Sequence, residues 1–214
     1  NRVFDIMELL SSVPQGMTLS DLANTAQLHI STTYRMLGTL AERGYIRKDS
    51  NSGKYRLTLR LFEVSKRVST VLDLLPVSEP MLTDLANFSR EAVHLVERDD
   101  NQVVYLYKFE PFQHIVNMGT YVGSSNPMYC TGVGKAILAQ LPRKEVEQIW
   151  ASEQIEAFTP NTVTTLEQLS QDLEGVRKRG FAYDNEEHEA GIRCIAAPIF
   201  DWQDQPVGAV SISA

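Results

Sequence analysis

Cysteine is nearly absent from this 214-residue chain, which contains only Cys130 and Cys194. Two cysteines so far apart do not make the disulfide framework of a small secreted domain, and they fit a reducing compartment. Long apolar runs are also missing, so no segment of about 20 residues is suited to cross a bilayer. No signal peptide is visible, although the chain begins at Asn1 and not at a Met. These absences predict a cytoplasmic protein without a membrane partner.

Positive charge is scarce in the chain as a whole, and its distribution is uneven. The net charge is −7, from 20 Lys and Arg against 27 Asp and Glu. Residues 1–60 hold eight basic and five acidic side chains, a net of +3, whereas residues 61–214 hold twelve and twenty-two, a net of −10. A basic front on an acidic body predicts nucleic-acid binding at one end only, with a different task for the body.

Residues 18–43 have the spacing of a helix-turn-helix. Thr18 is placed to cap a short helix, with Asp21 three residues later in a spacing like that of a capping box. Residues 27–30 make a turn, and we expect Ser31 to cap a second helix over 32–43. Its inward face is predicted to carry Tyr34, Leu37, Leu40 and Ala41. Its first turns would then present to DNA base edges the side chains of Ser31, Thr32, Thr33 and Arg35.

A β-hairpin, or wing, is predicted over residues 45–57 around the turn at 49–53. We expect four basic side chains of the wing to contact DNA phosphates: Arg47, Lys48, Lys54 and Arg56. An amphipathic helix at 2–12 would complete the core of this first domain, 1–58. The alternative is a small helical bundle with a solvated hairpin and no DNA-binding role.

A helix with an apolar stripe is predicted over residues 59–75 and is expected to end at Pro76. We interpret residues 59–76 as a linker helix between the first domain and a second domain at 77–214. An apolar stripe between domains must be buried, and a second copy of the chain is the economical partner.

The second domain mixes strands and helices without βαβ regularity. We expect helices at 81–88, 135–141 and 166–179, the last closed by Gly180, and a loop at 159–165. Strands are expected at 92–98, 103–109, 114–122, 181–185, 194–200 and 207–213. This pattern predicts an α+β fold with an antiparallel sheet and helices packed on it.

Two segments of the second domain could carry chemistry. Residues 129–135 are small residues at the start of a predicted helix, and the N-terminus of a helix favours a bound carboxylate or phosphate. The single Gly-x-Gly-Lys in this segment lacks the spacing of a Walker phosphate-binding loop. The alternative is an ordinary packed helix start without a ligand. Residues 183–194 combine acids with a His and a Cys. A metal site or an enzyme could use Asp184, His188 and Cys194, whereas a solvated acidic loop is the bland reading. Cys130 and Cys194 are also candidate nucleophiles, with no His placed in sequence to pair with them.

Several motifs together resemble the IclR family of bacterial transcriptional regulators. They are Leu-x-x-x-Gly-Tyr-Ile at 40–46, Gly-Lys-Tyr-Arg-Leu at 53–57, and the runs at 130–139, 184–201 and 209–213. The resemblance covers essentially the whole chain, and residues 184–201 are its most specific part. It implies a winged helix-turn-helix, a linker helix and a GAF-like effector domain, in dimers that pair into tetramers. Members commonly respond to small carboxylates or sugar acids from carbon catabolism.

The resemblance also implies an effector pocket and no cofactor. Carried over residue by residue, the pocket falls on Met118, Gly132, Val133, Asp184, Ile192, Cys194, Ser211 and Ser213. Amides of Gly132 and Val133 would hold a carboxylate, while Asp184 and the two serines would bind hydroxyl or carbonyl groups, with Met118 and Ile192 as apolar walls. Ser211 and Ser213 are two residues apart on an expected strand, so they share a face.

Two departures from the family pattern bear on these expectations. Val133 stands where some relatives have Ala, which bears on effector size, and the chain ends at Ala214, short of the terminal amphipathic helix usual in the family. The expected function is that of a ligand-responsive transcriptional regulator, a repressor, and not an enzyme. The rivals are an enzyme or metal sensor using the Asp184–Cys194 loop, and a pure dimerisation module with an empty pocket.

Overall fold

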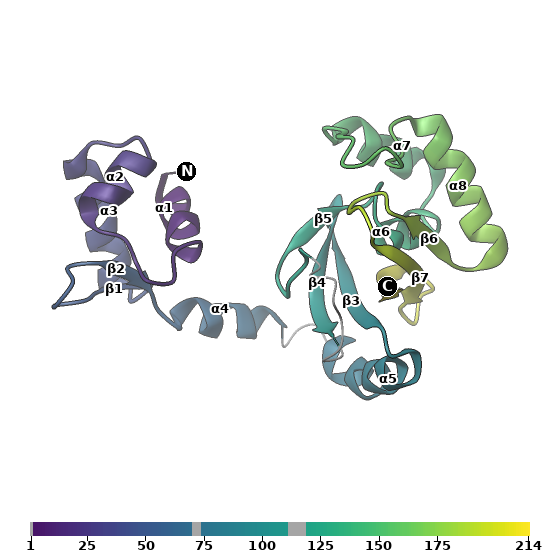
Figure 1. Ribbon diagram of the computed structural model, residues 1–214, viewed down its shortest axis with the longest axis horizontal. Helices are drawn as coiled ribbons and strands as arrows, with labels where there is room; N and C mark the ends of the chain where they lie inside the picture. Colours follow the sequence, from purple (N-terminus) through teal and green to yellow (C-terminus); the bar gives the residue numbers. More distant parts are fainter. Residues whose placement is uncertain (1, 70–73, 111–118) are drawn as a thin grey trace. The chain divides into compact units, whose positions relative to one another are not determined.

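The structure, a computed structural model, describes residues 2–69, 74–110 and 119–214 (Figure 1). The chain divides into two compact units, residues 1–73 and residues 74–214. Among the described residues, none of the helices combines the length and the apolar character that spanning a membrane requires.

The first unit is a three-helix core with a small hairpin, as predicted. Its elements are α1 (Arg2–Ser11), α2 (Leu19–Thr25), α3 (Ile30–Glu42), β1 (Ile46–Lys48) and β2 (Tyr55–Leu57). Thr18 caps α2 as expected, because its Oγ1 accepts a hydrogen bond from the Asp21 amide at 3.2 Å. One buried cluster joins all three helices to the hairpin: Ile6, Leu10, Leu22, Leu37, Leu40, Ile46 and Tyr55.

The predicted inward face of α3 was partly wrong. Thr33 is fully buried, whereas Tyr34 is 61% exposed and Ala41 faces solvent. The core-facing positions are Thr33, Leu37 and Leu40, which share one side of a helix because they are spaced by four and three residues. Thr33 is tolerated there because its Oγ1 donates to the His29 carbonyl at 3.2 Å. The helix begins at Ile30 and not after a Ser31 cap.

Parts of two described helices fall within the segment expected to form one linker helix. Helix α4 (Arg60–Ser69) is followed, beyond residues 70–73, by α5 (Leu74–Ser89). The expectation that a helix ends at Pro76 was wrong, because Pro76 lies in the first turn of α5. Proline is tolerated in a first turn, where the backbone N–H would have no intrahelical partner.

The second unit is built on a six-stranded sheet within the described residues. The strands are β3 (Ala92–Asp99), β4 (Gln102–Phe109), β5 (Ser125–Pro127), β6 (Ala182–Asn185), β7 (Arg193–Phe200) and β8 (Pro206–Ser213). Their order is β5-β4-β3-β8-β7-β6, and every neighbouring pair is antiparallel. The predicted α+β class is therefore confirmed. The strand expected at 114–122 is not found at 119–122, residues 114–118 lie outside the described residues, and β5 takes the sheet edge instead.

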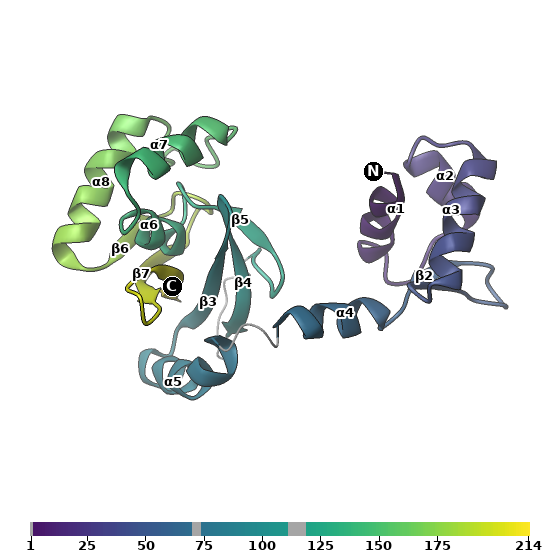
Figure 2. The ribbon, with the colours of Figure 1, turned by 180° about the vertical axis from the view of Figure 1, so that it is seen from behind.

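Helices cover both faces of this sheet. Helix α5 lies on one face, and α6 (Gly132–Leu138), α7 (Arg143–Ser152) and α8 (Leu166–Arg179) lie on the other (Figures 1 and 2). Helix α8 ends at Gly180, which has a φ of 84° as expected of a helix C-terminus. Helix α7 had not been predicted, and α6 begins three residues earlier than expected.

Alternation along the strands separates the two faces chemically. On β3, Val93 and Leu95 pack in the cluster under α5, whereas His94 points to the opposite face. On β8, Ser211 and Ser213 lie on the same face as His94, as their register opposite β3 requires. Polar residues on the α6 face thus line a pocket between the sheet and the start of α6.

Candidate functional site

The first turns of α3 present the side chains expected to read DNA bases. Ser31 and Arg35 are exposed and Thr32 is half-buried, so these three remain accessible. The expectation that Thr33 contacts bases was wrong, because its side chain is buried and faces the core and not solvent. Tyr34, which sequence reasoning assigned to the core, is exposed beside Arg35 and adds an aromatic group to this surface.

The wing carries its four basic residues in different environments. Arg47 and Lys48 are exposed, and the Lys48 ammonium lies 5.4 Å from the centre of the Tyr55 ring. Lys54 and Arg56 are half-buried, and Arg56 Nη2 contacts Asp49 Oδ2 at 3.1 Å. Arg56 is thus held against the wing turn, so a phosphate contact from it would compete with Asp49.

A pocket in the second unit brings together the residues that the family resemblance implied. Its lining includes Gly132, Val133, Asp184, Ile192, Cys194, Ser211 and Ser213. Met118 lies outside the described residues. The cavity that these residues line has a volume of about 40 Å³.

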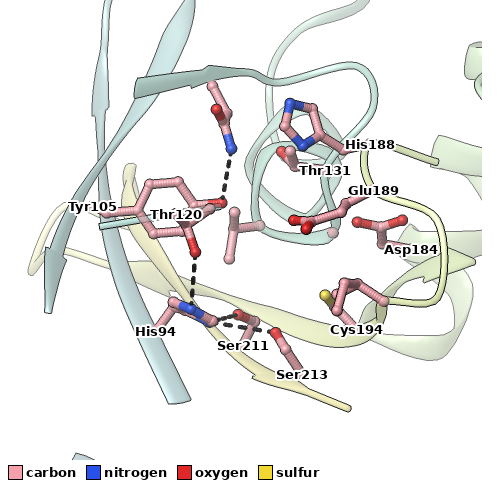
Figure 3. Close-up of a pocket in the computed structure, with 14 residues that line it drawn as sticks. His94, Tyr105, Thr120, Thr131, Asp184, His188, Glu189, Cys194, Ser211 and Ser213 are labelled. Atoms are coloured by element: carbon pink, nitrogen blue, oxygen red, sulfur yellow. Dashed lines mark hydrogen bonds between the residues drawn. The ribbon is translucent and has the colours of Figure 1, made fainter. Parts of the chain in front are cut away.

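The other residues that line the pocket were not expected to bind the effector, although His188 was a candidate metal ligand. They are His94, Tyr105, Thr120, Asn126, Thr131, His188 and Glu189. His94 lies at one side of the pocket, next to Ser211 and Ser213 (Figure 3). Its Nδ1 lies 3.3 Å from Ser213 Oγ and 3.5 Å from Ser211 Oγ, and its Nε2 lies 3.4 Å from Thr120 Oγ1.

Burial keeps the His94 ring neutral. Loss of hydration, reinforced by the positive charge of Lys108 and opposed by Glu110, lowers the pKa of His94 from 6.5 to about 4. The ring also packs edge-on against Tyr105, with ring centres 5.5 Å apart. A neutral imidazole donates from one nitrogen and accepts at the other, so it can orient the serine hydroxyls toward a ligand.

Asp184 and Glu189 place two carboxyl groups across the pocket from His94 (Figure 3). Burial raises the pKa of Asp184 from 3.8 to about 6, although hydrogen bonds from the Glu187 and Gly132 amides oppose the rise. The Glu187 amide donates to Asp184 Oδ1 at 2.9 Å. None of the described lining residues is a Lys or an Arg, so one side of the pocket is acidic and the rest is neutral.

The metal and nucleophile alternatives gain little from this geometry. Asp184, His188 and Cys194 do line one pocket, but within the described ranges no group of three or more His, Cys, Asp or Glu residues is placed to hold a metal ion. Burial raises the pKa of the Cys130 thiol and raises that of Cys194 to about 12. Both therefore stay protonated near neutral pH, and a thiol is a poor nucleophile.

Comparisons with known proteins agree with the two units. Residues 1–50 match the IclR helix-turn-helix domain, and residues 66–214 match the C-terminal domain of the bacterial transcriptional regulator IclR. The chain is 34% identical to the HTH-type transcriptional regulator KdgR of Escherichia coli K12, over 99% of this chain and 80% of that protein. It is also 34% identical to the DNA-binding transcriptional repressor YiaJ of the same organism, over 97% and 74% respectively.

A solved structure extends the likeness to the three-dimensional fold. It is an IclR homolog from Microbacterium hydrocarbonoxydans complexed with 4-hydroxybenzoate, with a TM-score of 0.85 and 25% identity, covering 99% of this chain and 87% of that one. The winged helix and the second unit are thus each matched by the same group of regulators, and the chain belongs to the IclR family of transcriptional regulators.

Proposed function

We propose that this chain is a repressor that binds operator DNA through its winged helix and releases or retains it according to a small acid in the pocket of the second unit. The observation that carries the proposal is the pocket, where polar groups from β3, β6, β7, β8 and α6 converge. A repressor among the similar proteins and a bound hydroxylated acid in one relative support it. In this proposal, residues 1–58 bind DNA, 59–76 link the domains and 77–214 bind the effector.

A hydroxy- or keto-acid carrying one carboxylate suits the lining best. Its carboxylate would be placed at the amides of Gly132 and Val133, and its hydroxyl or carbonyl groups would meet Asp184, Ser211 and Ser213. An ionised Asp184 accepts hydrogen bonds from hydroxyls and repels a second negative charge. The pocket should therefore select hydroxylated monoacids over plain diacids.

On DNA, we assign different tasks to α3 and the wing. Ser31, Thr32 and Arg35 would read bases, while the wing cations would hold phosphates. Arg35→Ala should cost about 1–3 kcal/mol on the specific site only. Lys54→Ala should weaken binding to all sequences alike and reduce the salt dependence by roughly one phosphate contact. Equal losses on specific and random DNA for both variants would contradict this division.

Self-association is part of the proposal. Several apolar side chains at and before the start of α4 face solvent in the single chain: Leu59, Phe62 and Val64. Pairing of this stripe with a second copy would give a dimer suited to a two-fold operator, and dimers would pair further. Phe62→Glu should then lower the oligomeric state in sedimentation, and unchanged oligomers would place the contact elsewhere.

A gel-shift assay with Asp184→Ala tests the proposed function. Operator fragments selected from random DNA are incubated with the protein and a panel of acids that includes 4-hydroxybenzoate, lactate, glycerate, gluconate, pyruvate and succinate. The wild-type chain should respond to at least one hydroxy- or keto-acid, and the variant should bind operator normally without responding. A variant that responds like the wild type would remove Asp184 from the mechanism.

A further inference from the structure

The largest fully buried side chain in the described residues is that of Lys135, a charged group that is not part of the pocket lining. It stands in the middle of α6 and is 1% exposed. Burying an ammonium group costs several kcal/mol of hydration unless it is paired. The burial of Lys135 is explained by the two carboxylates with which it pairs.

Lys135 joins the pocket loop to helix α8. Its Nζ lies 2.6 Å from Glu187 Oε1 and 2.7 Å from Asp172 Oδ2. Asp172 is on α8 and also contacts Arg179 at 3.2 Å. Glu187 belongs to the loop 186–192, between β6 and β7. One ammonium group therefore connects α6, the loop and α8.

The Glu187 carboxylate depends on Lys135 for charge compensation more than the Asp172 carboxylate does. Glu187 is buried, its Oε2 finds no hydrogen-bond partner within the described residues, and its Oε1 accepts from Lys135 and, at 3.3 Å, from the Asn185 amide. Asp172 is partly exposed and keeps Arg179 if Lys135 is lost. Removing the ammonium would leave a buried carboxylate uncompensated at Glu187, which the loop can relieve only by moving.

The loop that Glu187 anchors carries the acidic side of the pocket. The Glu187 amide donates to Asp184, and His188 and Glu189 follow directly and line the same pocket. The loop is also held from its other side, where Thr162 Oγ1 donates to the Glu187 carbonyl at 2.6 Å. Lys135 is the charged contact that acts from the interior, on the Glu187 side chain.

We propose that Lys135 is the positioning residue of the effector pocket: its ion pair with Glu187 holds the loop 186–192 in place and thereby sets where Asp184, His188 and Glu189 meet a ligand. The loop position is then fixed by a directional charge contact, and apolar packing alone does not reproduce it. The proposal rests on the proposed function for its ligand, but the position of the loop is measurable without any ligand.

The test compares four variants of the ligand-free chain by amide hydrogen exchange and thermal melting. Lys135→Met keeps the length of the side chain without its charge, and Lys135→Met/Glu187→Leu removes both charges. Asp172→Asn is the matched control, because it removes the other partner of Lys135 and keeps the Glu187 contact. Lys135→Arg is the conservative replacement, which keeps the charge.

The double variant separates positioning from stability. Replacing a buried ion pair by apolar groups is often neutral or stabilising, so the double variant should melt near the wild-type temperature. Its loop amides at 186–192 should nevertheless exchange faster, as they should in Lys135→Met, while Asp172→Asn keeps wild-type protection and Lys135→Arg restores part of it. Wild-type protection in the double variant, or equal loosening in Asp172→Asn, would overturn the proposal.

A second readout follows the Asp184 carboxyl by carbon NMR across pH. If the loop loosens and water enters, the pKa of Asp184 moves down from about 6 toward its ordinary value in Lys135→Met, whereas loss of the Lys135 charge alone would move it up. An unchanged titration would count against the proposal even if the melting temperature fell. Where the acid panel yields an effector, its affinity should drop on the order of tenfold to a hundredfold in the double variant, with operator binding unchanged.

Failure of the proposed function and failure of the proposed role of Lys135 give different results. A wild-type chain that ignores every acid, with a loop that still depends on Lys135, would reject the proposed effector and keep the positioning role. A chain that responds to an acid equally with and without the ion pair would keep the proposed function and reject the role of Lys135.

Discussion

At the scale of single residues, the pocket holds two titratable groups whose environments move their pKa values in unusual directions. Burial makes Asp184 a weaker acid and His94 a weaker base, so both favour their neutral forms. The consequences for stability have opposite signs. Stability falls as pH rises through the Asp184 window, whereas it falls as pH drops through the His94 window.

Asp184→Asn should change the pH dependence of unfolding. The folded wild type keeps this carboxyl protonated up to about pH 6, while the unfolded chain releases the proton near 3.8, so the wild type loses stability between these values. Asparagine does not titrate. Relative to the wild type, the variant should therefore gain roughly 2–3 kcal/mol between about pH 4 and pH 7. Urea unfolding at both pH values measures this difference, and a constant difference would show that burial does not control this carboxyl.

The His94 ring should stay neutral through the physiological range. Its folded pKa of about 4 lies below the ordinary 6.5, so the stability that its neutral hydrogen bonds contribute is complete above 6.5 and is lost as pH falls toward 4. NMR signals of the ring, assigned with a His94→Gln variant, should not move between about pH 5.5 and pH 8. A midpoint near 6.5 would mean that water reaches the ring.

The residues of the pocket were predictable to different degrees. Asp184 and the serines follow from a family resemblance that names positions, and Ser211 and Ser213 also from strand alternation. His94 had a weaker signal, a single His in an apolar strand. Tyr105 and Asn126 come from β4 and β5, and their contact, 3.4 Å between Asn126 Nδ2 and the Tyr105 hydroxyl, depends on strand pairing that local spacing does not contain.

At the scale of elements, α6 shows how glycine misleads a sequence-based boundary. The helix was expected at 135–141, yet Gly132 and Gly134 both lie within it, with Thr131 Oγ1 accepting from the Gly134 amide at 3.2 Å. The reason is close packing: a Cβ at Gly134 would stand 2.3 Å from Met128 Cα and 2.4 Å from the Met128 carbonyl oxygen. Gly134 allows the α6 backbone to pack directly against the backbone at Met128, a contact that the sequence pattern does not predict.

Gly134→Ala should therefore destabilise the second unit by about 1–3 kcal/mol or more, because backbone atoms have to shift to admit the methyl group. The control is Gly175→Ala in α8, where the new Cβ would meet the guanidinium end of Arg179 and no backbone atom of another segment, so that variant should cost less stability than Gly134→Ala. Thermal melting of both variants makes the comparison. Similar melting temperatures for the two would contradict the packing account of α6.

Other boundaries were set by competition between local signals and packing. The inward face of α3 was predicted wrongly because Thr33 has no apolar side chain, although its hydrogen bond to the His29 carbonyl permits burial. Helix α7 was missed because its apolar positions, Val146 and Ile149, are few within a charged segment. Helix α8 was found correctly, since Thr165 and Gly180 mark its two ends chemically.

At the scale of the whole molecule, the division of charge anticipated two units, and the structure separates the chain at residues 73 and 74. Composition could indicate that the units have different tasks, because a basic segment attracts phosphates and an acidic one does not. Neither unit alone contains the coupling between DNA binding and acid binding. That coupling is the free energy by which one bound ligand changes the affinity of the chain for the other.

The central claim is that the pocket and the DNA-binding unit are coupled, and reciprocity tests it most directly. Operator affinity is measured by fluorescence anisotropy with and without the acid that shifts it, and acid affinity by calorimetry with and without operator. The account predicts one common factor for both, typically about 5–150-fold, and no change of either affinity in Asp184→Ala. An acid that binds the wild-type chain with the same affinity whether or not operator is present would contradict it.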